Sequence, residues 1–297
     1  MSKLEALRMQ VRALEGYHFE TCLGDQVLPF DDCRLNAPLP LDGLQLGALH
    51  EFRSDGLEAE LSPAVTAFTA TVAARILRKQ EGYALWASSR ADCYAPGLIR
   101  LGLDSARIVW VDCRKDEEVL GVMEEALHSR ALTAVVGEAG ALSLKTGRRL
   151  DAAARQSGVT ALLLRRPLFK PSKAGCGPSG AAATRWCVSA VPHRHPGTGL
   201  PVSRIAKTTA LSPFKVPDNA VGASGMTAPG LGPPCWRLDL EYCRNGRTAS
   251  WIVEALDGSD GEGIEAGHVR VLAELRNDAC EDEAAPPRKP QRTARAS

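Results

Sequence analysis

Apolar residues follow two alternating periods along the chain from Leu46 onward. Short apolar runs suited to strands are followed by stretches in which apolar residues recur every three or four positions, as on one face of a helix. Runs such as "AVVG" at 134–137 and "ALLL" at 161–164 are typical of strands covered on both faces of a parallel sheet. The predicted strands are 47–52, 83–88, 107–112, 132–139 and 159–166, and the predicted helices are 62–79, 95–102, 116–129 and 145–158. This order predicts an α/β domain with a mostly parallel central sheet and helices on both faces.

Capping residues mark the expected ends of three of these helices. Ser62 is the expected N-cap of the first helix, and Pro63 is its expected first residue. At that position an N–H has no helical partner, so proline, which lacks one, loses no hydrogen bond. Asp116 is the expected cap of 116–129, and Gly158 the expected end of 145–158. The inward faces should be formed by Val65, Phe68, Val72 and Ile76 in the first helix and by Val119, Val122, Met123 and Leu127 in the third.

The pattern changes after Arg166. A strand is expected at 184–192, and two alternating runs around Asn245-Gly246 predict a β-hairpin. These strands should form an antiparallel set attached to the edge of the parallel sheet. Residues 193–234 are rich in Pro, Gly, Ser and Thr, and are expected to be a disordered insertion that is dispensable for folding. The hairpin residues expected to share a face within each strand are Trp236, Leu238 and Leu240 in the first and Trp251 and Val253 in the second.

Both ends of the chain differ from this core. Leu4, Leu7, Val11 and Leu14 form an apolar stripe on a predicted helix at 3–15, which either packs on its own domain or docks on a neighbouring protein. Residues 17–44, rich in Pro and Asp, are expected to be extended. Residues 269–275, "VRVLAEL", fit a strand or a helix. The predicted parts are therefore an N-terminal helix and linker at 1–43, the α/β domain at 44–256 and a polar, largely disordered tail at 257–297.

Composition narrows the function only slightly. The chain of 297 residues is 44% apolar and 24% charged, with a net charge of +1, so composition gives no reason to expect strong nucleic-acid or membrane affinity. No signal-peptide pattern opens the sequence, and no apolar run approaches the roughly 20 residues that span a bilayer. We expect a cytoplasmic protein. The nine cysteines include no C-x-x-C pair, so we expect structural cysteines, no metal site and no disulfides.

The segment 46–68 reads as a strand, a loop and a helix, where many α/β proteins hold a nucleotide. A phosphate-binding loop needs glycine amides, a lysine and a hydroxyl that holds magnesium. Here the loop has a single glycine, Gly56, no lysine, and two acidic residues, Glu58 and Glu60. The strand-end aspartate expected for magnesium is replaced by Gly137, with Glu138 one place later. The sequence therefore predicts a degenerate nucleotide fold with no cofactor and no catalytic residues.

Other catalytic patterns are missing as well. The chain has no G-x-S-x-G elbow, no H-E-x-x-H and no glycine-rich dinucleotide fingerprint after a strand. His50, at the end of a predicted strand, is interpreted as a structural histidine rather than a base. His128 is isolated in sequence.

Several ordered blocks resemble a known family. They include "LPLDGLQLGALHEF", "APGLIRLGLDSARIVWV", "GRRLDAAARQSGVTALLLRR", "ATRWCVSAVP" and "CWRLDLEYCRNGRTASWIVE". Together they resemble the ImuA family, the RecA-like accessory proteins of the bacterial damage-inducible mutagenesis cassette. The likeness runs from about residue 3 to residue 256 and leaves out 193–234. More distantly, the blocks are similar to the RecA ATPase core, whose catalytic glutamate would fall near Ser89 or Arg90 and is missing here.

The resemblance implies a RecA-like core and a non-catalytic role in SOS-induced, error-prone translesion DNA synthesis. The implied partners are ImuB, an error-prone DnaE-type polymerase reached through the complex, and RecA. In RecA the corresponding N-terminal helix docks on the neighbouring subunit, so the stripe at Leu4, Leu7, Val11 and Leu14 is the candidate partner-binding surface. Two alternatives stay open: a SulA-like inhibitor of cell division and a divergent RecA-type DNA-dependent ATPase.

Direct DNA binding is less favoured than the interpretation that the loops in question are simply solvated. The resemblance places one DNA-binding loop of RecA at 139–146, shortened, and the other within 167–183. The second loop contains Lys170 and Lys173, with Phe169 as its one aromatic, which makes a thin single-strand site. Four arginines, Arg148, Arg149, Arg165 and Arg166, form either a basic patch or a solvated surface.

Overall fold

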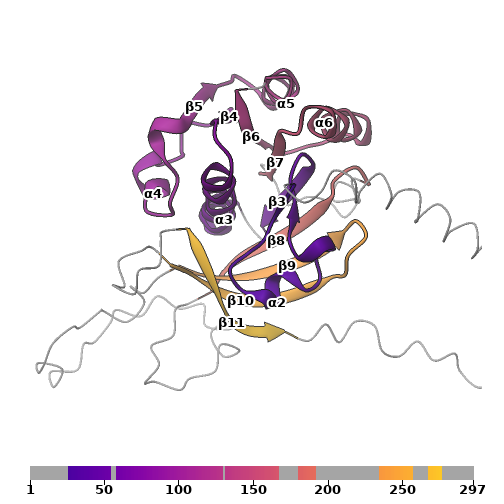
Figure 1. Cartoon of the computed structure of the whole chain (residues 1–297). Helices are drawn as coiled ribbons and strands as arrows, with labels where there is room; N and C mark the ends of the chain where they lie inside the picture. Colours follow the sequence, from indigo (N-terminus) through magenta and orange to yellow (C-terminus); the bar gives the residue numbers. More distant parts are fainter. Residues whose placement is uncertain are drawn as a thin grey trace, which may run out of the picture.

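A nine-stranded mixed sheet with helices on both faces forms the molecule, which confirms the predicted fold class (Figure 1). The computed structural model describes residues 26–54, 58–129, 131–166, 180–191, 234–256 and 267–275. The strand order is β11-β10-β9-β8-β3-β7-β6-β4-β5. Among these described residues, no helix is long and apolar enough to cross a membrane.

The six strands from β5 to β8 run parallel. Their bounds are β3 Leu49–Ser54, β4 Tyr83–Ser88, β5 Ile108–Asp112, β6 Leu132–Ala139, β7 Thr160–Arg165 and β8 Thr184–Val191. The continuous apolar runs of β6 and β7 are buried on both faces, as predicted, because Val135 and Leu163 face one helical layer and Val136 and Leu162 face the other.

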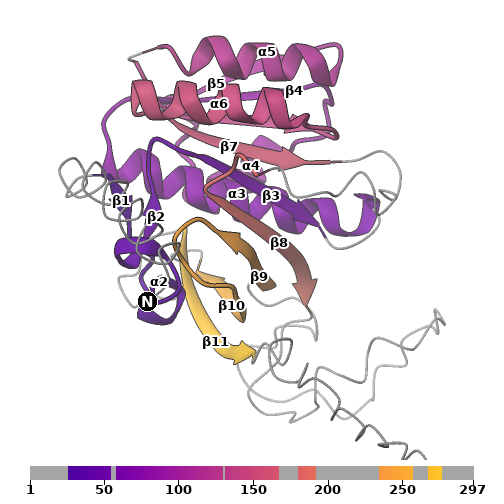
Figure 2. The same ribbon diagram turned by 90° about the vertical axis from the view of Figure 1, so that its right-hand side faces the viewer.

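Two helical layers cover the parallel strands. Helix α3 (Glu58–Lys79) packs Phe68, Val72 and Ile76 on one face of the sheet. Helices α5 (Asp116–Ala126) and α6 (Leu144–Ser157) pack on the other face through Met123 and Leu150. Figure 2 shows α5 and α6 side by side above β7, and α3 on the other side of that strand. A short helix α4 (Ala95–Ile99) and a 3-10 turn η2 (Ser105–Arg107) lead into β5.

The ends of the helices agree only in part with the expected caps. Gly158 ends α6 in a left-handed conformation, with φ of 80°, as predicted. The predicted start of α3 at Ser62 is wrong, since the helix begins at Glu58 and Pro63 lies inside it. A proline near the amino end removes one hydrogen bond, the one that its missing N–H would donate, and the helix continues through it. At the other end, Arg107 donates to the carbonyls of Leu77, Gln80 and Gly82 at 2.6–2.8 Å.

The C-terminal strands form the predicted antiparallel extension. Strands β9 (Cys235–Cys243) and β10 (Ala249–Leu256) make the hairpin around Asn245-Gly246, and β9 pairs with β8. Their predicted apolar face is buried around an aromatic cluster in which Phe68 lies 5.9 Å from Trp186 and 5.8 Å from Trp236, between ring centroids. Trp186 and Trp251 stack at 6.1 Å.

Two regions predicted to lie outside the core belong to it. Residues 269–275, placed in a largely disordered tail, lie in strand β11 (His268–Leu275), whose Val269 and Val271 are buried. The expectation of an extended linker is also wrong for residues 26–44. These residues form β1 (Val27–Leu28), α2 (Cys33–Asn36), the 3-10 turn η1 (Pro40–Asp42) and β2 (Leu44–Gln45). The other residues of the linker and tail lie outside the described residues.

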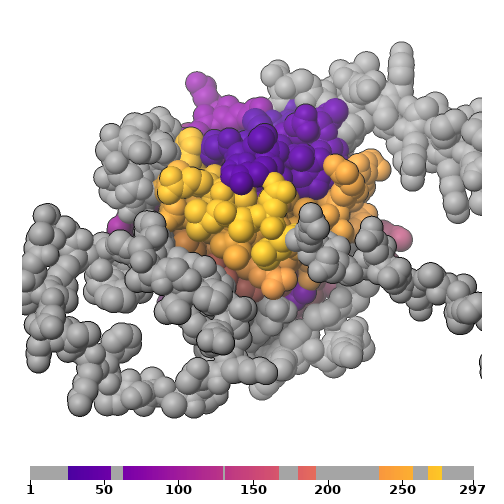
Figure 3. Space-filling view, turned by 90° about the horizontal axis from the view of Figure 1, so that it is seen from below, coloured from indigo at the N-terminus to yellow at the C-terminus, as the bar shows by residue number. Residues whose placement is uncertain are grey.

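Residues 26–45, here called the N-terminal segment, pack on α3 and β11 because they are more apolar than a solvated linker. Leu28, Phe30, Leu35, Leu39 and Leu44 are all buried in the same core. Asp31 pairs with Arg75 of α3 and lies 3.1 Å from His268 Nδ1. Figure 3 shows this segment, in indigo, against yellow β11.

Candidate functional site

The carboxyl ends of the parallel strands form the edge where open α/β sheets bind their ligands. Here β3, β4, β6 and β7 end at Ser54, Ser88, Ala139 and Arg165, so the residues at those positions decide which chemistry the edge can perform. The side chains there form two arginine–carboxylate clusters, one around Glu138 and one around Glu51.

Glu138, on β6, is 2% exposed and is surrounded by protein donors. Its Oε1 accepts from Trp86 Nε1 at 2.7 Å, and its Oε2 accepts from Ser88 Oγ at 3.1 Å and from Arg166 Nη1 at 2.6 Å. Arg166 also pairs with Asp92 at 2.6 Å. Since the buried carboxylate is neutralised by a buried guanidinium and hydrogen-bonded on both oxygens, it has a structural role.

Charges around this cluster leave no activated nucleophile. The pKa of Asp92 is lowered, first by its hydrogen bond from Arg166. Burial, together with the charges of Glu138 and Asp92, raises the pKa of the nearby Cys93 thiol to about 11. The thiol is therefore protonated at neutral pH and is not nucleophilic.

The second cluster lies at the end of β3. Glu51 is 1% exposed, with Oε2 at 3.2 Å from Arg165 Nη1 and 3.6 Å from Arg185 Nε. Arg53, two residues later, donates through Nε to Glu241 at 2.8 Å. The cations beside the loop that would hold phosphates are thus bound to carboxylates of the chain itself, and the loop supplies no lysine.

A magnesium-binding aspartate does not fit where the sequence lacks one. A Cβ atom on Gly137 would lie 2.1 Å from Met123 Sδ of α5, far inside contact distance. Helix α5 therefore packs directly on the glycine backbone, in the space that an aspartate side chain would need. Among the described residues, no group of three His, Cys, Asp or Glu side chains could hold a metal ion.

Ser89 and Arg90, where the resemblance to RecA places a catalytic glutamate, form hydrogen bonds within the fold. Ser89 Oγ donates to Asp116 Oδ1 at 2.9 Å, and Arg90 donates to the carbonyl of Arg166 at 2.9 Å. Asp116 also accepts from the Gly140 amide at 2.6 Å. The expectation that Asp116 caps its helix is wrong, because Lys115 is the N-cap residue and Asp116 instead joins the ends of β4 and β6.

His50 is structural, as interpreted from the sequence. It is fully buried, with Nδ1 at 2.7 Å from Thr184 Oγ1 and Nε2 at 2.7 Å from the Gln45 carbonyl. Burial lowers its pKa to about 4, so the ring is neutral and ties β3 to β8 and to the N-terminal segment.

The candidate binding residues divide into two groups. Leu4, Leu7, Val11, Leu14, Lys170 and Lys173 lie outside the described residues. Of the four arginines, Arg149 pairs with Glu124 on the surface, whereas Arg165 and Arg166 turn into the carboxyl edge. Arg166 is only 7% exposed, so it belongs neither to an exposed basic patch nor to a solvated surface. Both interpretations are wrong for this residue.

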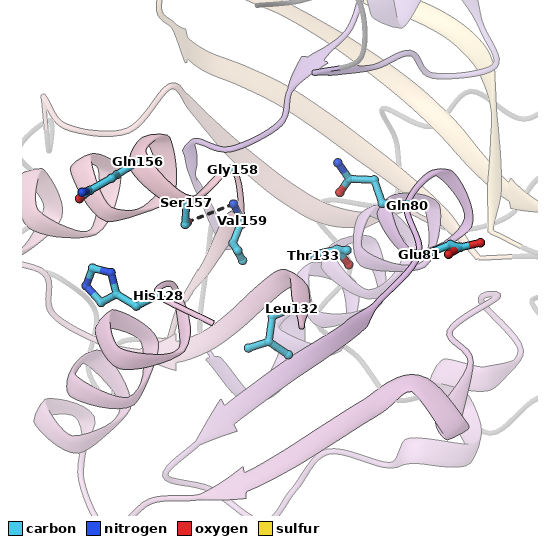
Figure 4. A pocket seen from close by; sticks show the side chains of 9 residues that line it. All are labelled: Gln80, Glu81, His128, Leu132, Thr133, Gln156, Ser157, Gly158 and Val159. Carbon is cyan, nitrogen blue, oxygen red and sulfur yellow. Dashed lines mark hydrogen bonds between the residues drawn. The ribbon is translucent and has the colours of Figure 1, made fainter. Parts of the chain in front are cut away.

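A cavity of about 770 Å³ lies at the opposite, amino edge of the parallel strands (Figure 4). Its polar lining comes from the last residues of α6 and from residues that follow α3 and α5, with Gln156, Ser157 and His128 on one side and Gln80 and Glu81 on the other. His128 is exposed at this cavity. The arginine–carboxylate pairs described above lie at the other edge of the sheet. This cavity lies away from the strand ends at which α/β proteins place their chemistry.

Comparisons with known proteins identify similar chains. No protein-family model matches this one. It is 34% identical over 239 residues to Protein ImuA from Caulobacter vibrioides, in strain NA1000 / CB15N and in strain ATCC 19089 / CIP 103742 / CB 15, covering 79% of this chain and 86% of the relative. The crystal structure of SulA from Pseudomonas aeruginosa is similar at 22% identity and a TM-score of 0.34, covering 39% of this chain and 96% of SulA. The similarity to ImuA thus extends over most of both chains.

Proposed function

This chain belongs to the ImuA family, and from that membership we propose that it is a non-catalytic accessory protein of SOS-induced, error-prone translesion DNA synthesis. In this role it acts as an adaptor or a RecA modulator, in a complex with ImuB and a DnaE-type polymerase. The observation that supports a non-catalytic role most directly is the carboxyl edge of the sheet. Its buried Glu138 is neutralised by Arg166, and its Gly137 leaves no room for a metal-binding side chain.

Phosphoryl transfer needs positioned cations and a carboxylate that holds magnesium or orients water. At this edge Arg53 and Arg165 are paired with Glu241 and Glu51. An incoming triphosphate would have to break these ion pairs, with no lysine and no magnesium site to replace them. Binding to other proteins requires neither, and the fold offers a rigid scaffold for it.

The enzymatic alternative is tested with ATP hydrolysis by the purified full-length chain, with and without single-stranded DNA. We expect no turnover above a mock purification. The matched variants are Glu138→Gln, which replaces the carboxylate best placed to act as a base, and Arg237→Gln, on the exposed surface of β9. Turnover that Glu138→Gln abolishes and Arg237→Gln preserves would overturn the proposal.

The adaptor role is tested by capture of purified ImuB and RecA on the immobilised chain. The fold dictates where truncations fall, since residues 26–45 and 267–275 are part of the core. Chains lacking 1–25 or 276–297 should therefore fold, and we expect removal of 1–25 to weaken capture because it deletes Leu4, Leu7, Val11 and Leu14. Absence of binding to both proteins by the full chain would contradict the adaptor role.

A further inference from the structure

A second cavity, of about 650 Å³, opens between the N-terminal segment and the strands β10 and β11. Pro38 lines it on one side, and Ala249 and Trp251 of β10 line it on the other. Four charged residues of both signs complete the lining, and they are Arg34, Asp42, Arg247 and Glu274. An apolar floor with mixed charges around it suits a segment that itself carries charges of both signs.

Two of these four charged side chains have no partner within the described part of the chain. Arg34 pairs with Asp32 at 2.6 Å and lies 4.0 Å from Glu274. The side chains of Arg247 and Asp42 are exposed and form no hydrogen bond or ion pair with any described residue. The cavity thus has one unpaired cation and one unpaired carboxylate.

The ladder between β10 and β11 stops beside this cavity, at the pair Ser250–Leu275. The amide and carbonyl of one residue in an antiparallel strand point to the same neighbour, and successive residues alternate. The Leu256 carbonyl accepts from Gly267, so the even-numbered residues of β10 face β11. By this alternation Thr248 turns its amide and carbonyl toward the position two residues after Leu275. Among the described residues, neither group has a backbone partner.

The register of this ladder decides which residues of the tail come next. Continued by three residues, it gives the pairs Ala249 with Arg276, Thr248 with Asn277 and Arg247 with Asp278. Glu274 and Trp251 face each other across the ladder, and both line the cavity. Because alternate residues of a strand share a face, Arg276 and Asp278 belong to the cavity side.

We propose that residues 276–278, which lie outside the described residues, continue β11 along β10 and cover this cavity, with Asp278 paired to Arg247. Arg276 adds a positive charge to a lining that holds the carboxylates of Glu274 and Asp42. The chain's own tail is the favoured occupant because it begins at the cavity, directly after Leu275, and carries its charges in the matching order. A tethered segment also has a high effective concentration.

Hydrogen exchange at the Thr248 amide tests the backbone pairing. In the full chain this amide should exchange about tenfold or more slowly than in a chain that ends at Leu275, which lacks the acceptor at Asn277. A chain that ends at Glu283 keeps residues 276–278 and should keep the protection. The Ala255 amide, bonded to the Pro234 carbonyl, serves as the unchanged reference. Equal exchange at Thr248 in the full chain and in the chain ending at Leu275 would overturn the proposal, and so would lost protection in the chain ending at Glu283.

Two further conditions separate the tail from other occupants of the cavity. Removal of residues 1–25 should leave the exchange at Thr248 unchanged, and so should a rise in protein concentration. Protection that disappears with residues 1–25 would assign the cavity to the start of the chain. Protection that grows with concentration would assign it to a second copy. Either result rejects the tail as the occupant.

A pair of introduced cysteines tests the register and the face. Arg247→Cys combined with Asp278→Cys should form a disulfide on air oxidation, because facing residues of an antiparallel pair lie about 4.5–5.5 Å apart between Cα atoms. The matched control combines Arg247→Cys with Asn277→Cys, whose second cysteine lies on the other face and should not react. Both chains carry Cys280→Ser, which removes a competing thiol, and non-reducing peptide mapping identifies the bond. Equal cross-linking in the two chains, or none in the first, would reject this arrangement.

Discussion

The two halves of the sheet differ in how their charges are paired. In the parallel half, Glu138 and Glu51 are 2% and 1% exposed, and both are held by arginines at the carboxyl edge. In the antiparallel half, the core is a cluster of tryptophan and phenylalanine rings, the Arg237–Asp239 pair lies on the surface, and the buried Glu254 pairs with an exposed Arg270. A buried ion pair rarely adds stability over apolar side chains of similar volume. The Arg166–Glu138 pair, in which both side chains are buried, lies at the edge where α/β folds hold ligands.

The largest effect that follows from this contrast is at Glu138. Glu138→Ala leaves Arg166 buried without its buried partner and should lower the free energy of unfolding by about 3–5 kcal/mol. Urea denaturation monitored by circular dichroism measures the loss. Asp239→Ala, in a surface pair of the antiparallel half, should cost under about 1 kcal/mol. Equal losses in the two variants would remove the contrast.

A double variant separates charge from packing in the Glu138 cluster. Glu138→Leu combined with Arg166→Met removes both charges and should be less destabilising than Glu138→Ala alone. A double variant that is less stable than the single one would show that the ion pair itself contributes net stability.

The next effect is a pH dependence within the parallel half, where His50 joins β3 to β8, the strand next to the antiparallel half. Its pKa is lowered to about 4 in the folded chain, from an ordinary 6.5. The unfolded chain therefore binds one more proton between these values. Stability contributed by neutral His50 is fully present above pH 6.5 and is lost as the pH falls toward 4, by on the order of 3 kcal/mol. Denaturation midpoints over this range should lose that slope in His50→Gln, and an unchanged slope would show that other groups cause it.

A smaller loss is expected where α5 packs on β6. Gly137→Ala places a methyl group against Met123 and should destabilise the chain by about 1–3 kcal/mol. Met123→Ala in the same chain should recover part of the loss by making room. Thermal denaturation of the two variants measures both effects. If Gly137→Ala alone is neutral, the helix can move aside, and an aspartate at position 137 becomes structurally feasible.

A small effect is also expected at Asp31, in the N-terminal segment that packs on β11. Its side chain is 35% exposed although it pairs with Arg75 and His268, so Asp31→Ala should cost about 1 kcal/mol. Hydrogen exchange should localise the change to the N-terminal segment, where the Ala37 amide bonds to the Cys33 carbonyl. Faster exchange throughout β6 and β7 would mean that this segment stabilises the whole sheet.

The sequence predicts the parallel half well because its strands and helices follow local periods. Strand β6 begins and ends where its apolar run does, and Gly158 ends α6 for a reason that is visible locally. The missing lysine and aspartate are equally local observations. Arg166 was misplaced because its partner Glu138 is 28 residues away and no spacing rule links them.

The N-terminal segment was misjudged because its apolar residues follow no single period. Leu28 lies in a short strand, Leu35 in one helical turn, and Phe30 and Leu39 in the connections, and all four are buried. A count of large apolar residues would have been the better signal, since a solvated linker rarely carries so many. Strand β11 was left open between a strand and a helix because its apolar residues fit both periods over eight residues.

The contact between the N-terminal segment and β11 has a consequence for synthesis on the ribosome. The Asp32 carboxylate bonds to an amide 239 residues further along the chain. At about 5–20 residues per second, roughly ten to fifty seconds pass before that amide leaves the ribosome. During this time Phe30 and Leu35 have no β11 to cover them, and the half-finished chain offers apolar surface to chaperones. The first strands made must wait for the last one, so a premature stop before β11 should yield a chain that aggregates.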